Sequence, residues 1–213
     1  MKGIRKELVS VILIFMLSFL YAWLRYVVFG PYTSHDLLFI LNKASAFTVV
    51  LNTFVAYSPV RLSQLNRKII GIASFYTALL HVILSLVLLP TGYYKAYHFD
   101  TGKLSPAFGL AVFFGILALL TLIAIFLYFK TRPRKEVNYR IFKQLTSIYY
   151  VFLALHIFLL GYKHWIHIRG WYGGFPPITL ISFILLLASW PLVMYFMRKK
   201  MQPGDENQAP STD

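Results

Sequence analysis

Two histidines, His81 and His156, are the residues of this sequence whose type and position most favour chemistry. Each lies within a long apolar stretch whose core contains no Asp or Glu, so no carboxylate proton relay is evident. An ionisable side chain within such a stretch is costly and usually serves a function. Because a neutral imidazole is a good metal ligand, we interpret the pair as ligands, in preference to two isolated hydrogen-bonded histidines.

The number and type of the available ligands narrow the choice of metal. The chain has no cysteine, which excludes thiolate zinc sites, iron–sulfur clusters and disulfides. Zinc takes three or four protein ligands, whereas the apolar stretches offer two imidazoles. A haem iron takes four ligands from the porphyrin and needs two axial ligands. A bis-His haem b is therefore the most economical interpretation, and filled axial positions favour electron transfer over oxygen binding.

The surroundings of one histidine are consistent with a flat ligand. Small residues at spacings of three and four share a helix face with it, namely Gly71, Ser74, Ala78, His81 and Ser85. Such a stripe would make room for a macrocycle, and close packing of two helices is the alternative explanation.

The elements that must position these residues are membrane-spanning helices. Hydrophobic residues make up 58% of the 213 residues and charged residues 13%, which excludes an ordinary soluble domain. Six stretches have the length of about 20 residues that a spanning helix needs. We predict an all-α integral membrane protein, a six-helix transmembrane bundle, with spans at residues 8–29, 37–59, 69–90, 106–129, 146–166 and 178–197.

The spans bring the two histidines to nearly the same depth. His81 follows the start of its span by about 18 Å and His156 by about 15 Å, at 1.5 Å per residue. Both spans begin on the same side of the membrane, so the two helices are parallel and each presents an imidazole near the middle of the bilayer.

The distribution of charge predicts the orientation. Of the 21 Lys and Arg residues, 15 flank the spans on one side, and both chain termini lie on that side. By the positive-inside rule the N and C termini are cytoplasmic, in a multi-pass protein of the cell (inner or plasma) membrane. The net charge of +14 does not indicate nucleic acid, because the basic residues lie between apolar runs. Residues 1–200 form one transmembrane domain in contact with the lipid bilayer, and residues 201–213 form a disordered cytoplasmic tail.

Three segments also resemble a known family, the ferric-reductase-like transmembrane domains. Residues 66–81, Asn-Arg-Lys-Ile-Ile-Gly-Ile-Ala-Ser-Phe-Tyr-Thr-Ala-Leu-Leu-His, are similar to the third-helix motif of this family. Residues 149–156 are similar to its fifth helix, and residues 41–44 to a segment common in bacterial members. In size and plan the chain most resembles the haem-binding membrane subunits of bacterial periplasmic methionine sulfoxide reductase systems; STEAP metalloreductases and NADPH oxidases are more distant.

The resemblance implies that His81 and His156 are the axial ligands of a haem b. Members with two haems have a further histidine about thirteen residues to the cytoplasmic side of each ligand. Those positions are Lys68 and Lys143 here, which predicts a single haem. Relatives receive electrons through a flavin (FMN or FAD) or a quinone. A basic cluster could bind a flavin phosphate, although we favour a role in topology and anionic-lipid contact for it; it consists of Arg132, Arg134, Lys135, Arg140 and Lys143.

Four further residues are candidates on the outer side. Arg25 and Lys43 lie near the outer ends of their spans, where they would pair with haem propionates or else extend to the lipid headgroups. His164 and His167 lie one turn apart at the outer end of the fifth span. They could bind a metal, a quinol or a docking partner together with the nearby His98, but ordinary interfacial histidines are the favoured interpretation. His35 gives no signal.

These observations favour a membrane electron-transfer subunit with one haem b. The chain has no GxGxxG motif, so we expect the quinone pool or a cytoplasmic flavin reductase as donor and an outer-face redox partner or ferric iron as acceptor. Whether the chain is itself an enzyme is left open. The alternatives are a non-redox transporter or assembly factor without cofactor, and a haem sensor or carrier with an open coordination position.

Overall fold

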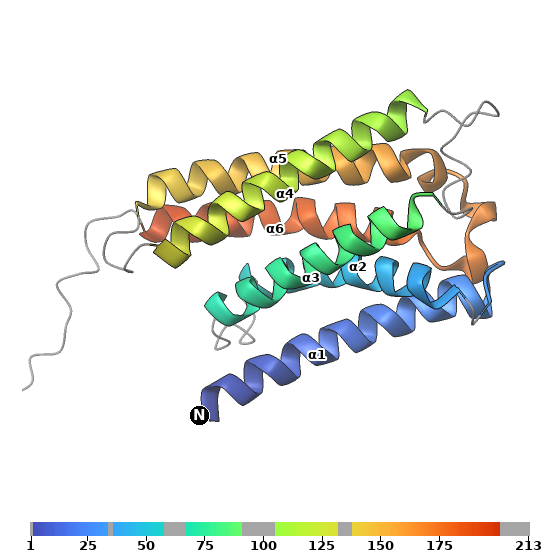
Figure 1. Cartoon of the computed structure of the whole chain (residues 1–213), viewed down its shortest axis with the longest axis horizontal. Helices are drawn as coiled ribbons and strands as arrows, with labels where there is room; N and C mark the ends of the chain where they lie inside the picture. The colour runs from blue at the N-terminus through green and yellow to red at the C-terminus, as the bar shows by residue number, and fades with distance from the viewer. Residues whose placement is uncertain (1, 34–35, 58–66, 91–104, 132–137, 201–213) are drawn as a thin grey trace, which may run out of the picture.

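The computed structural model describes residues 2–33, 36–57, 67–90, 105–131 and 138–200 (Figure 1). Several predicted features lie outside these residues. They are the tail 201–213, His35, His98, and the cluster members Arg132, Arg134 and Lys135.

Every regular element in the described part of the chain is helical, which confirms the all-α prediction. Six of the helices are long and apolar enough to cross a membrane, so the chain is a multi-pass membrane protein by length and composition. The elements are α1 (Lys2–Trp23), the π-helical turn η1 (Leu24–Val28), α2 (Leu37–Tyr57), α3 (Arg67–Leu88), α4 (Pro106–Thr131), α5 (Tyr139–Trp165), the short 3₁₀ turns η6 (Ile168–Gly170) and η7 (Tyr172–Gly174), and α6 (Ile178–Lys200).

The largest difference from the predicted boundaries is the start of α5. The helix begins at Tyr139, seven residues before the expected start of the span. The Asn138 side chain caps it, because its amide oxygen accepts hydrogen bonds from the backbone N–H groups of Arg140 at 2.9 Å and Ile141 at 3.4 Å. The first turns of α5 are therefore a polar extension that apolar patterning does not reveal.

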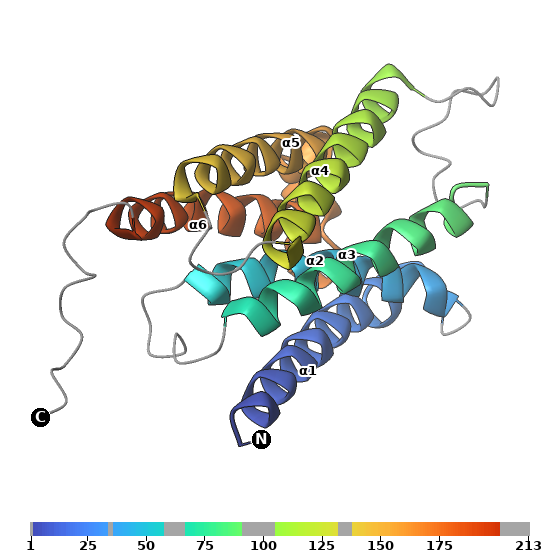
Figure 2. The same cartoon turned by 60° about the vertical axis from the view of Figure 1, so that its left-hand side comes forward.

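α2 is the central helix of the bundle. It packs against α1, α3 and α6, while α5 packs against α4 and α6. The two views agree that α1 flanks α2 and α3 on one side and that α4 and α5 lie on the opposite side (Figures 1 and 2). In the most apolar stretch of each span, 56% of the residues are buried in α2, compared with 11% in α4. Large apolar side chains on the outer helices are exposed, as contact with lipid requires; examples are Leu17, Leu86 and Phe113.

The two ends of the bundle differ in charge. The N-terminus of α1 and the C-terminus of α6 lie at the same end (Figure 1). Exposed basic side chains gather at this basic end, where they include Lys6, Lys68, Lys130, Arg140 and Arg198. The separation of charge agrees with the predicted alternation of the loops, while the assignment of this end to the cytoplasm stays a prediction.

At the end of the bundle opposite the basic end, α5 and α6 are joined by one close contact. The indole N–H of Trp165 donates a hydrogen bond to the hydroxyl of Thr179 at 3.0 Å. Gly161 lies one turn before Trp165, and a Cβ there would collide with both of these polar side chains. This contact between Trp165 and Thr179 therefore requires a glycine at position 161.

We expect Gly161→Ala to lower the free energy of unfolding by about 1–3 kcal/mol, the usual cost of overpacking. Unfolding in mixed micelles measures the change. Gly109→Ala on α4 is the matched control, because a Cβ there meets no atom within 4 Å. An unchanged stability of the Gly161 variant would contradict this packing.

Candidate functional site

The imidazole of His81 on α3 is oriented by α2. Its Nδ1 lies 2.5 Å from the side-chain oxygen of Asn42 and 3.2 Å from the backbone oxygen of the same residue. Both oxygens accept hydrogen bonds, so Nδ1 carries the hydrogen and donates it. The Ser85 hydroxyl, one turn after His81, donates a further hydrogen bond to the Asn42 side-chain oxygen at 3.2 Å. Asn42 is 1% exposed, so this network is internal to the protein.

The imidazole of His156 on α5 is oriented by α4. Its Nδ1 donates a hydrogen bond to the backbone oxygen of Ala111 at 2.7 Å. Gly115 lies one turn after Ala111 and allows this approach, because a Cβ at Gly115 would lie 2.7 Å from Nδ1 and 2.9 Å from Cε1 of the ring. No other residue type could occupy position 115 without moving the imidazole.

The two histidines therefore share one tautomer. With the hydrogen on Nδ1, the Nε2 atom of each neutral ring keeps its lone pair for a metal. A metal-ligating histidine almost always donates its other ring N–H to a carbonyl or carboxylate oxygen, and that bond fixes the tautomer and the plane of the ring. Both histidines are half-buried, and they lie within the range at which their charges would interact.

The two rings come from different helix pairs. α3 packs against α2, and α5 packs against α4 and α6. Among the described residues, α3 and α5 are not themselves one of the closely packed pairs. Each of the two histidine helices is thus packed against a neighbour that bonds its histidine.

Lys43 lies close to this pair. It follows Asn42 on α2 and is within electrostatic range of both His81 and His156. Its Nζ lies 5.0 Å from the centre of the Phe39 ring, a cation–π distance. The structure therefore brings Lys43 together with the two histidines, although it does not test a role in binding an anion.

Arg25 lies in the π-helical turn η1 and is 5% exposed. Its Nη1 donates a hydrogen bond to the backbone oxygen of Phe175, and its guanidinium lies 5.5 Å from the ring of Tyr26 and 5.2 Å from that of Tyr172. The side chain thus lies inside the protein and does not extend to the surface of the bundle. These contacts tie the end of the first span to the segment that precedes α6, a role that sequence reasoning missed.

His164 and His167 are both exposed, but the expectation that they lie one turn apart on one helix is wrong. α5 ends at Trp165, and His167 has non-helical dihedral angles, so it lies beyond the helix. Each is involved in a local contact, because Nδ1 of His167 donates to the backbone oxygen of Lys163 and the Trp171 indole donates to the backbone oxygen of His164. No group of three or more potential metal ligands occurs among the described residues.

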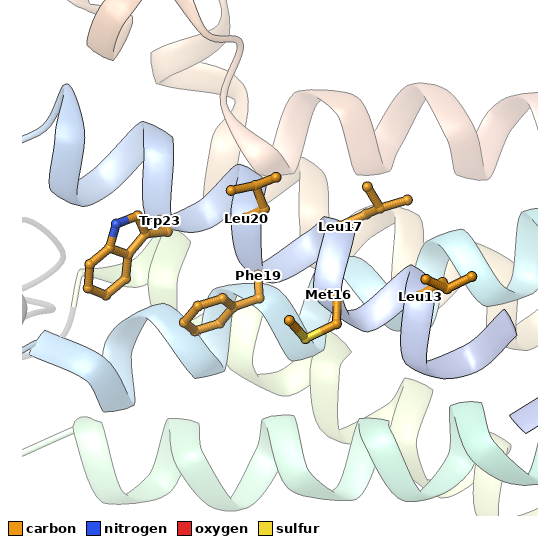
Figure 3. A pocket seen from close by; sticks show the side chains of 6 residues that line it. All are labelled: Leu13, Met16, Leu17, Phe19, Leu20 and Trp23. Carbon is orange, nitrogen blue, oxygen red and sulfur yellow. The ribbon is translucent and has the colours of Figure 1, made fainter. Parts of the chain in front are cut away.

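Sequence reasoning did not single out Asn42 or Gly115 for the site. The sequence could have indicated Asn42, because an amide within an apolar stretch must find a hydrogen-bond partner. The carbonyl of Ala111 has no signal, since every residue has one. An apolar pocket on the outside of α1 is unrelated to the site, because none of the candidate residues lines it (Figure 3); its lining is Leu13, Met16, Leu17, Phe19, Leu20 and Trp23.

Comparison with protein-family models finds no match for this chain, and no curated protein is similar to it. The resemblance to ferric-reductase-like transmembrane domains therefore depends on three short segments, residues 41–44, 66–81 and 149–156.

We expect Asn42→Ala to lower the free energy of unfolding by about 1–3 kcal/mol, because it leaves the Ser85 hydroxyl unpaired and removes the shorter acceptor of His81. Chemical unfolding in mixed micelles measures this loss. Thr77→Val on α3 is the control, since the Thr77 hydroxyl bonds only the carbonyl of Ala73 in its own helix. Equal effects of the two substitutions would contradict the network.

Proposed function

We propose that the protein binds one haem b between α3 and α5, with Nε2 of His81 and of His156 as the axial ligands, and that it transfers electrons across the membrane. The observation that carries the proposal is the shared tautomer. Both Nδ1 atoms donate to oxygen atoms of neighbouring helices, and this leaves both Nε2 atoms with a lone pair. Two such rings from helices that are not closely packed on each other suit a flat ligand between them.

A cation close to the two histidines supports the proposal through its charge. A haem carries two propionates, and a buried carboxylate needs a cation or hydrogen bonds. Lys43, within electrostatic range of both imidazoles, is the candidate cation. Arg25 is a weaker candidate, because its Nη1 already bonds the Phe175 carbonyl, although its Nε has no hydrogen-bond partner.

The chemistry would be the exchange of one electron between the ferric and ferrous forms of the bound iron. The role of the protein would be to keep the two imidazoles in fixed orientations in the ferric and the ferrous form. Asn42 on α2 and the Ala111 carbonyl on α4 do this by hydrogen bonds that need no rearrangement when the charge of the iron changes.

The donor and the acceptor follow from the orientation that the charges predict. The basic end would face the cytoplasm, where the quinone pool or a flavin reductase supplies electrons through a quinone, FMN or FAD. At the opposite end, near His164 and His167, a periplasmic or extracytoplasmic redox partner or ferric iron would accept them. A non-redox transporter or assembly factor is the second candidate function, and it requires no cofactor.

An absorption spectrum of the detergent-purified protein, oxidised and then reduced with dithionite, tests the proposal. We expect a sharp reduced b-type spectrum that His81→Ala and His156→Ala both abolish, because each removes an axial ligand. His164→Ala is the control, since His164 is exposed and lies two turns beyond His156. A colourless protein from haem-replete cells would contradict electron transfer and favour transport or assembly.

The support behind His156 can be tested separately. Gly115→Ala should push the imidazole away from Ala111 and lower the affinity for haem by roughly 10–100-fold, as the loss of a hydrogen bond to a metal-ligating histidine does. Gly109→Ala on the same helix should leave the affinity unchanged, because its Cβ enters open space. Haem titration of the apoprotein measures both, and equal affinities would exclude the proposed approach across Gly115.

A further inference from the structure

Four polar atoms on α2 and α3 are buried without any hydrogen-bond partner. They are the hydroxyls of Ser45 and Ser74 and both polar atoms of the Asn52 side chain. Ser45 and Asn52 are 0% exposed and Ser74 is 8% exposed. Leaving such a group unpaired in an apolar interior costs about 1–3 kcal/mol, so native structures rarely tolerate it.

The usual solution in a helix is not used by these two serines. Elsewhere in the chain, serine and threonine hydroxyls donate to the carbonyl four residues earlier; examples are Ser18, Thr48, Thr53, Thr77 and Thr121. The hydroxyls of Ser45 and Ser74 make no such bond. A partner outside their own helices would satisfy them.

The register of α2 and α3 brings these groups together. The two helices are antiparallel neighbours (Figure 1), and Asn42 faces His81 and Ser85 across their interface. Ten residues further along α2 corresponds to ten residues back along α3, which places Asn52 at the level of residues 71–75. Ser74 is at this level and on the same face as His81.

The same register relates Ser45 to the histidine. Three residues beyond Asn42, it lies at the level of Ala78 and His81. By their level along the helices, the unpaired atoms thus form a line on the pair of α2 and α3. It begins with Ser45, at the level of His81, and runs about 10 Å to Asn52, at 1.5 Å per residue, toward the basic end of the bundle.

We propose that ordered water molecules occupy this line, one of them bridging Asn52 and Ser74 and another bonded to Ser45. Two polar groups that lie at one level of two packed helices without a direct hydrogen bond can be joined by a bridging water. A buried water makes two to four hydrogen bonds to otherwise unsatisfied groups, and the Asn52 amide alone offers a donor and an acceptor. A water molecule is small enough to join two serine or amide groups of packed helices, whereas a ring-shaped ligand would have to separate the pair.

The water line would also act on the site, a consequence that rests on the proposed function. Haem reduction potentials depend on hydrogen bonding and solvent exposure around the group. Water dipoles and polar side chains beside His81 stabilise the ferric form, which has the higher positive charge. Removing them should therefore raise the midpoint potential.

The first test is a high-resolution crystal or cryo-microscopy map of the full chain, with water itself as the ligand that is sought. We expect density within hydrogen-bond distance of both Asn52 and Ser74, and a second peak at Ser45. A direct hydrogen bond between Asn52 and Ser74, an empty interface or an organic molecule in this place would overturn the proposal. This test is independent of haem.

The second test is a double-mutant cycle with Asn52→Leu and Ser74→Ala. If one water joins the two side chains, either substitution releases it, and the effects on the unfolding equilibrium should be non-additive by about threefold or more. Asn52→Leu with Thr48→Val is the control cycle, because the Thr48 hydroxyl bonds its own helix at the Ala44 carbonyl. Additive effects in the first cycle would refute the bridge.

A redox titration then separates the two proposals. In a haem-containing preparation, Asn52→Leu should raise the midpoint potential and Thr48→Val should not. An unchanged potential would contradict the effect on the site, whereas a protein without haem contradicts the proposed function and leaves the map to decide the water line.

Discussion

The hydrocarbon of a bilayer offers no partner to a polar group, so every donor and acceptor within the spans must be satisfied by the protein or by water enclosed in it. α2 is where this constraint acts most strongly. Its buried side chains include Asn42, Ser45, Thr48 and Asn52, and the helices packed around it exclude lipid. The central position of α2 and the orientation of His81 are therefore two consequences of one requirement, because the amide that must be shielded from lipid also bonds the imidazole.

The same constraint explains the support of His156. This ring has no side-chain partner among its hydrogen bonds and instead uses the Ala111 carbonyl, which is accessible because position 115 is a glycine. Both imidazoles thus carry the hydrogen on Nδ1, but one donates it to a side-chain amide and the other to a backbone oxygen. Such rigid, pre-oriented rings suit a cofactor that changes charge without changing its ligands.

At the end of the bundle opposite the basic end, the buried group that needs a partner is a charge and not an amide. Arg25 is buried, and a π-helical turn presents its guanidinium to a backbone carbonyl and two aromatic rings. The Tyr21 hydroxyl donates to the neighbouring carbonyl of Pro176 at 2.7 Å. Together these bonds attach the end of the first span to the segment that precedes α6.

The sequence by itself determined the helical class, the six spans, the separation of charge between the two ends and the presence of two histidines within apolar stretches. Hydropathy and charge are sums over neighbouring residues, so they can be determined before the chain folds. Only the tertiary structure decided that Asn42 and the Ala111 carbonyl orient the rings, that Arg25 bonds the carbonyl of Phe175, and that α5 extends back to Tyr139. These contacts depend on the rotation and register of helices that are distant in the chain, and no local pattern specifies which oxygen a ring will meet.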